Sequence, residues 1–281
     1  MKLIPSNQLE LLIHGNVLKK LIVLYQEDKL PNKILLKGQK GIGKSTLAYH
    51  LINFVLSKNE DFPYDIDHFK IDEKNRSFKL INNGSSPNFF LIDIQADKKN
   101  INIDQIRNII QDLNKSSLNN KPKFVLIDNS EYLNKNSINV LLKVIEEPND
   151  NIYFILIQNQ KTLLSTLTSR FIKFNINLTN KESIFVINKL INGDIHNSVN
   201  SDFINYYFSP GNIYRMMEFC DENNIDLKNI ELKDFINILI QNNHIKKQKD
   251  LRYIFYEIIE CLLKKNQYYL IWTTIIILLR K

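Results

Sequence analysis

The stretch GQKGIGKS, residues Gly38–Ser45, decides the fold of this 281-residue chain. It matches the pattern G-x-x-x-x-G-K-[ST] of a phosphate-binding loop. The apolar run KILLK at 33–37 comes directly before it, and the helix-forming run TLAYHLINFVL at 46–56 comes directly after it. A loop between a buried strand and a helix is the context that this pattern requires, so the sequence predicts a nucleotide site here.

The residue types of the loop have chemical reasons. Glycines let the backbone approach phosphate closely, and successive backbone N–H groups at a helix N-terminus hold anionic oxygens. Lys44 is expected to contact the β- and γ-phosphates, and the Ser45 hydroxyl to ligate Mg²⁺. The predicted nucleotide-binding residues of the loop are Gly38, Gly41, Gly43, Lys44, Ser45 and Thr46.

Outward from the loop, short β-prone apolar runs alternate with segments of helical periodicity. The expected strands are 33–37, 88–94, 123–128, 152–157 and 171–176, and the expected helices are near 44–57, 103–114, 135–147 and 161–166. Continuous apolar runs are typical of parallel strands that are buried on both faces. The alternation therefore predicts an α/β domain with a parallel five-stranded sheet and flanking helices.

Two regions depart from this alternation. Residues 59–88 have little periodicity and contain NNGSSP, which predicts an irregular insertion. After residue 177 the remainder is expected to be helical, with breaks at 192–194, 209–211 and 223–224.

A second chemical signal is the apolar run FVLI at 124–127, which ends in Asp128. An acid at the carboxyl end of a sheet strand is placed to orient Mg²⁺ beside bound phosphates. The next residue is Asn129, and an amide cannot accept a proton from water as a carboxylate can. Glu131 lies two residues further on, and its side chain need not reach the position that a carboxylate at residue 129 would occupy. Binding ATP and hydrolysing it are thus separate predictions.

Composition sets broad limits on the protein class. Lys and Arg total 37 against 30 Asp and Glu, and the net charge of +7 gives modest support for an anionic partner such as nucleic acid. Only two cysteines, Cys220 and Cys261, exclude a disulfide framework and a four-Cys zinc site. The N-terminus lacks a signal-peptide pattern, and the most apolar stretch, 268–279, is shorter than the roughly 20 residues of a membrane span. We therefore expect a soluble cytoplasmic protein that does not bind membranes.

Together, these segments resemble the AAA+ clamp-loader ATPases of bacterial replication over about residues 5–177. The run KGQKGIGKSTLAYHLINFVL is similar to the family's Walker A segment, and INIDQIRNIIQDL to its D-x-I-R helix. The run KFVLIDNSEYLNKNSINVLLKVIEEPNDNIYFILI is similar to its Walker B strand, the following helix and the sensor-1 strand. The segment LLSTLTSRFIKF is similar to the S-R-C segment that carries an arginine finger, with Phe171 in place of the Cys.

The resemblance implies a P-loop AAA+ domain at 1–177, a helical lid at 178–221 and a short helical collar at 222–281. It implies ATP with Mg²⁺ as cofactor, and Ser45 and Asp128 as the residues that contact the Mg²⁺ ion of the bound nucleotide. Arg170 is the implied arginine finger, supplied to the nucleotide of a neighbouring subunit, and Arg107 is a candidate DNA contact. The implied partners are other clamp-loader subunits (gamma/tau and delta), the sliding clamp and primed DNA.

Departures from the family pattern indicate which kind of subunit this is. Asn129 lacks the catalytic carboxylate, and Gly211 stands where motor subunits carry an arginine. No cysteine occurs in 59–88, so no zinc is expected. The absence of the carboxylate and of the arginine favours a subunit that supplies Arg170 to a neighbouring subunit and hydrolyses ATP only weakly itself. The alternatives are a gamma/tau-type motor that hydrolyses ATP, a small-molecule P-loop kinase, and a site that binds nucleotide structurally or stays empty.

Overall fold

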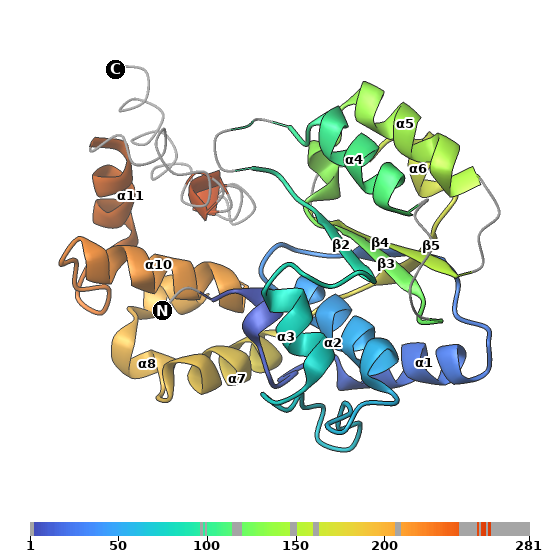
Figure 1. Ribbon diagram of the computed structural model, residues 1–281. Coiled ribbons are helices and arrows are strands. Elements are labelled where there is room, and N and C mark those ends of the chain that lie inside the picture. Colours follow the sequence, from blue (N-terminus) through green and yellow to red (C-terminus); the bar gives the residue numbers. More distant parts are fainter. Residues whose placement is uncertain are drawn as a thin grey trace. The chain divides into compact units, whose positions relative to one another are not determined.

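Five apolar segments form one parallel sheet in the computed structural model (Figure 1). They are β1 (Lys33–Lys37), β2 (Phe89–Ile92), β3 (Lys123–Ile127), β4 (Ile152–Gln158) and β5 (Ile172–Asn175). Their order across the sheet is β2-β3-β4-β1-β5, and every pairing is parallel. The predicted five-stranded parallel sheet is confirmed. β2 and β5 are shorter than the expected runs 88–94 and 171–176.

The structure describes residues 3–95, 98, 100–113, 120–146, 151–159, 163–205, 209–241, 252, 254–256, 258 and 259. The chain divides into two compact units, one with residues 1–39 and 43–177 and the other with 40–42 and 178–281. The boundary expected at 221/222, between lid and collar, stays a prediction.

Helices cover both faces of the sheet in the first unit. They are η1 (Pro5–Asn7), α1 (Gly15–Gln26), α2 (Lys44–Ser57), α3 (Arg76–Asn82), α4 (Ile103–Leu113), η2 (Ser130–Tyr132), α5 (Lys135–Glu146) and α6 (Ser165–Thr168). α1 and α2 lie on one face, and α4, α5 and α6 on the other (Figure 1). All five residues of β3 are buried, as expected for a strand that is covered on both sides.

The structure corrects one expected helix and adds two that were not expected. The helix expected at 161–166 begins only at Ser165, because Leu164 is extended (φ −58°, ψ 134°). α3 forms inside the stretch 59–88, which was expected to be irregular. It is only seven residues long, too short for its periodicity to stand out in the sequence. α1 precedes the phosphate-binding loop and buries Leu18, Leu21 and Ile22.

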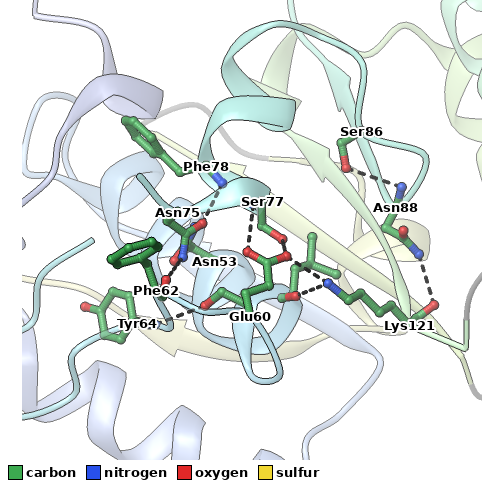
Figure 2. A network of polar contacts seen from close by, with 12 residues as sticks. Asn53, Glu60, Phe62, Tyr64, Asn75, Ser77, Phe78, Ser86, Asn88 and Lys121 are labelled. Carbon is green, nitrogen blue, oxygen red and sulfur yellow. Dashed lines mark hydrogen bonds and ion pairs between the residues drawn. The ribbon is translucent and has the colours of Figure 1, made fainter. Parts of the chain in front are cut away.

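A polar network fixes the segment that contains α3 (Figure 2). Asn75 caps α3 by accepting a bond from Phe78 N at 2.7 Å, and its amide donates to Phe62 O at 2.7 Å. Glu60 accepts bonds from Ser77 N at 2.9 Å and from Lys121 Nζ at 2.9 Å. Burial alone would raise the pKa of Glu60, but the hydrogen bonds from Ser77 and Lys121 outweigh it and lower the pKa. The segment is therefore held to the residues just before β3 by paired polar groups.

The buried His50 makes the stability of the first unit depend on pH. Its ring nitrogens contact Tyr64 Oη at 2.9 Å and Gln8 O at 3.1 Å. Burial lowers the pKa of His50 to about 4, against the opposing effect of the Gln8 bond. Below pH 6.5 the unfolded chain binds a proton that the folded chain does not, so stability falls as the pH drops toward 4. We expect a loss of about 2 kcal/mol between pH 7.5 and 5.

Urea unfolding at these two pH values measures this loss, with His50→Gln as the matched variant. An amide does not titrate in this range, so the variant should show a smaller decrease in unfolding free energy. Equal decreases in the two proteins would refute the role of His50.

The second unit is helical in the residues that the structure describes. Its helices are α7 (Asn180–Ile191), α8 (Ile195–Ser198), α9 (Ser201–Asn205), α10 (Pro210–Glu222) and α11 (Leu232–Gln241). Phe203, Met216 and Phe235 are fully buried at its centre. The apolar stretch 268–279 lies outside the described residues. In the described part of the chain no helix has the length and apolar character needed to cross a membrane.

Candidate functional site

The parallel strands bring four polar positions to one edge of the sheet. Gly38 follows β1, Asp93 follows β2, Asp128 follows β3 and Asn159 follows β4. The carboxyl ends of parallel strands meet at the same edge, where α/β proteins bind their ligands. The phosphate-binding loop and the predicted acid therefore lie at one site.

The loop and the first turn of α2 form an anion-binding geometry. Gly38 N donates to Gln158 O at 3.2 Å, which anchors the loop to the end of β4. Gly43 caps α2 with φ 89°, a left-handed conformation that favours glycine. Lys44, Ser45 and Thr46 form the first turn of α2, whose backbone N–H groups and dipole attract phosphate.

Lys44 is buried, with 3% of its surface exposed, and its ammonium group is held by backbone and side-chain oxygens. Nζ donates to Gly38 O at 3.0 Å, to Gln39 O, and to Asn159 Oδ1 at 3.0 Å. A buried ammonium needs such acceptors because desolvation without them is costly. The contacts also keep the ammonium group beside the loop that is predicted to hold the phosphates.

Ser45 and Asp128, the two predicted magnesium-facing residues, lie together. Ser45 Oγ donates to Asp128 Oδ2 at 2.6 Å. A hydroxyl and a carboxylate are oxygen donors of the kind that Mg²⁺ prefers, so the pair fits the metal. Burial, followed by the negative charges of Asp128 and Asp93, raises the pKa of the neighbouring Tyr49 hydroxyl. The carboxylates of Asp93 and Asp128 therefore both lie close enough to Tyr49, at this edge of the sheet, to affect its hydroxyl.

Asn129 is the centre of a side-chain network rather than a base. Its Nδ2 donates to Asp93 Oδ1 at 2.8 Å, and its Oδ1 accepts a bond from Asn159 Nδ2 at 3.1 Å. Glu131 does not replace a base at position 129, because its carboxylate accepts bonds from Asn159 N at 3.3 Å and Nδ2 at 2.8 Å. The side chains next to Asp128 are therefore the amides of Asn129 and Asn159, and neither can act as a general base.

Asn159 and Asp93 are site residues that the sequence reasoning missed. Asn159 links the Lys44 ammonium group to Asn129 and Glu131. Each is the first residue after its strand, and that position was the available signal. To predict these two residues from that position, one must know that β2 and β4 both lie next to β3 in the sheet. The order of the strands along the sequence does not reveal this.

Gly41 belongs with the second unit, where it meets the start of α10. Gly211 N donates to Gly41 O at 2.9 Å. A Cβ added to Gly211 would lie 2.9 Å from Gly41 Cα, which is closer than real Cβ atoms approach. A side chain at position 211 would therefore displace Gly41.

Arg170 lies at the opposite edge of the sheet from the loop, whereas Arg107 lies near the start of α4, the helix that follows β2. Arg170 follows α6 and precedes β5, so it lies at the amino ends of the parallel strands. Phe171 is buried in the core that α4 and α5 form with the sheet. Arg107 lies on α4, is mostly exposed, and forms an ion pair with Asp104 at 3.5 Å.

Comparisons with known proteins agree with this arrangement. The family model described as "DNA polymerase III, delta subunit" matches residues 13–180. A DNA polymerase III subunit delta' of Buchnera aphidicola subsp. Baizongia pistaciae is 30% identical over 59% of this chain and 49% of that protein. The subunit delta' of Bacillus subtilis is 31% identical over 56% of this chain and 46% of that protein. A subunit gamma of Buchnera aphidicola subsp. Schizaphis graminum is 28% identical over 72% of this chain and 55% of that protein.

The chain spans about half the length of these relatives. The family match covers more than half of the chain and includes both the phosphate-binding loop and the segment around Arg170. The chain therefore belongs to the DNA polymerase III delta-subunit family, and within it resembles the delta-prime proteins.

Proposed function

We propose that this chain acts as a delta-prime-like subunit of the replicative clamp loader. In this proposal it binds ATP weakly or structurally and supplies Arg170 to ATP on a neighbouring ATPase subunit. The neighbour's ATP hydrolysis is thereby coupled to loading the sliding clamp onto primed DNA. Its partners are the gamma/tau and delta subunits, the clamp and the DNA.

The observation that carries the proposal is the position of Arg170 relative to the chain's own loop. Ile172 pairs with Ile34, so Arg170 lies about level with residue 32, before β1 begins. Gly38 comes six residues later along the same direction, a separation of about 20 Å at the rise of a strand. An arginine side chain does not span that distance. Arg170 therefore serves a nucleotide on another subunit if it serves one at all.

The chain's own loop fits a bound nucleotide but not rapid hydrolysis. Lys44 and the Ser45–Asp128 pair match the contacts that ATP with Mg²⁺ needs. When bound, Mg²⁺ would neutralise charge on the phosphates. Asn129 supplies no carboxylate to activate water, and a missing general base costs about 10²–10⁴ in rate.

The ATPase rate of the reconstituted assembly, with clamp and primed DNA, tests this division of roles. Arg170→Ala should lower the rate strongly, whereas Lys44→Ala should leave most of it. If Lys44→Ala abolished the rate and Arg170→Ala left it unchanged, the proposal would be wrong.

A gamma/tau-type motor subunit is the second candidate, favoured by the complete phosphate-binding loop and by the similarity to a gamma subunit. The two candidates differ in the isolated chain. A motor would turn over ATP rapidly by itself, and a delta-prime-like subunit would not.

A further inference from the structure

We propose that Glu146 is the positioning residue for Arg170: it holds the guanidinium group so that the outer N–H groups face a neighbouring subunit's phosphate. This inference rests on the proposed function of Arg170. It adds a residue that acts through Arg170 and has no contact of its own with nucleotide.

Three hydrogen bonds fix the Arg170 side chain. Nε donates to Glu146 Oε1 at 2.8 Å, and Nη2 donates to the same oxygen at 2.5 Å. Nη1 donates to Thr166 O at 2.5 Å, on the last turn of α6. The guanidinium group is thus held by α5 on one side and by α6 on the other.

The contacts leave part of the guanidinium group available. Arginine has five N–H donors, and these three bonds use the Nε proton and one proton on each Nη atom. Within the described residues, one N–H on each Nη atom remains, and the side chain is 38% exposed. An arginine N–H that is exposed in this way forms a strong, charge-assisted bond to a phosphate oxygen. A phosphate could therefore bind without displacing Glu146.

The location of Glu146 points to the same role. It is the last residue of α5, where the helix dipole disfavours a carboxylate. Lys143, one turn earlier, is the residue type that this end of a helix favours. Helix stability therefore does not explain a glutamate at this position, whereas the contact with Arg170 does.

An exposed ion pair contributes little to folding, so its value here is orientation. A free arginine side chain samples many rotamers, and most of them would point away from a neighbour's phosphate. Transition-state stabilisation depends steeply on placement. We expect loss of Glu146 to lower the rate that depends on Arg170 by about 5- to 30-fold, less than loss of Arg170 itself.

The test measures kcat and KM for ATP in the reconstituted assembly with clamp and primed DNA. Glu146→Ala should lower kcat about 5- to 30-fold and leave KM within about twofold, since the finger acts on the transition state. Glu146→Asp keeps the charge on a shorter side chain and should recover part of the loss. Glu146→Gln keeps the shape without the charge and should recover less than Asp.

Glu27→Ala is the matched control, because Glu27 forms an ion pair of similar exposure with Lys29 at 2.9 Å. It should leave kcat unchanged. In an Arg170→Ala background, Glu146→Ala should cause no further loss, because a positioning residue has nothing left to position. Thermal unfolding of each variant separates a loss of placement from a loss of folding.

The failures of the two proposals differ. If Arg170→Ala lowers kcat strongly and Glu146→Ala does not, only the positioning role is overturned. A rise in kcat on Glu146→Ala also overturns it, because the carboxylate would then be masking Arg170. If Arg170→Ala has no effect, the finger function fails and the role of Glu146 fails with it.

Discussion

Replacing Arg170 with alanine is expected to lower ATP hydrolysis at the neighbouring site of the reconstituted assembly, with DNA and clamp present, about 10³-fold. An arginine finger stabilises charge that develops on the phosphoryl group during transfer, so its loss acts on kcat. Removing the side chain also breaks its bonds to Glu146 and Thr166, but both are at the exposed surface and folding should change little. Steady-state kinetics at saturating ATP measures the effect.

Arg170→Lys is the informative companion variant. It keeps the positive charge but cannot present two N–H groups side by side, so most of the loss should remain. A lysine variant as active as the wild type would mean that charge alone is needed at this position. An unchanged rate in Arg170→Ala would refute the finger role and move the gamma/tau-type alternative forward.

Replacing Asn75 with alanine is expected to lower the free energy of unfolding by about 2–4 kcal/mol. Asn75 is fully buried, and its side chain accepts bonds from Phe78 N and Asn53 Nδ2 and donates to Phe62 O (Figure 2). Alanine removes the cap of α3 and leaves three polar groups without this partner: Asn53 Nδ2 in a buried bond, and Phe78 N and Phe62 O in partly buried ones. A fully buried group costs about 1–3 kcal/mol when nothing replaces the bond, and a partly buried one costs less.

Urea unfolding with two further variants tests this prediction. Asn82→Ala, at the exposed end of α3, should change the unfolding free energy by no more than about 0.5 kcal/mol. Asn75→Ser retains an oxygen that can cap the helix and should lose less than Asn75→Ala. If Asn75→Ala and Asn82→Ala were equally stable, the network would not hold the segment.

The sheet and the phosphate-binding loop could be predicted because their signals are local. Each strand is a continuous apolar run, and the loop is one uninterrupted motif next to a strand and a helix. The neighbourhood of Ser45 and Asp128 followed from the rule that parallel strands end at one edge.

The features that escaped prediction depend on residues far apart in the chain. α3 and its surroundings are fixed by bonds such as that from Lys121 to Glu60, which are 61 positions apart. Asn159 reaches Lys44 across 115 positions, and Arg170 reaches Glu146 across 24. Sequence periodicity reports which face of an element is apolar, but it does not report which polar side chains will meet.

The satisfied ammonium group of Lys44 has a consequence for the rate at which nucleotide binds. Under the proposed function, its bonds to Gly38 O, Gln39 O and Asn159 Oδ1 would be exchanged for bonds to phosphate, a step within the protein that follows the arrival of the nucleotide. Such a unimolecular step limits association once nucleotide is abundant. In stopped-flow traces the observed rate should therefore level off with rising nucleotide concentration rather than increase in proportion to it.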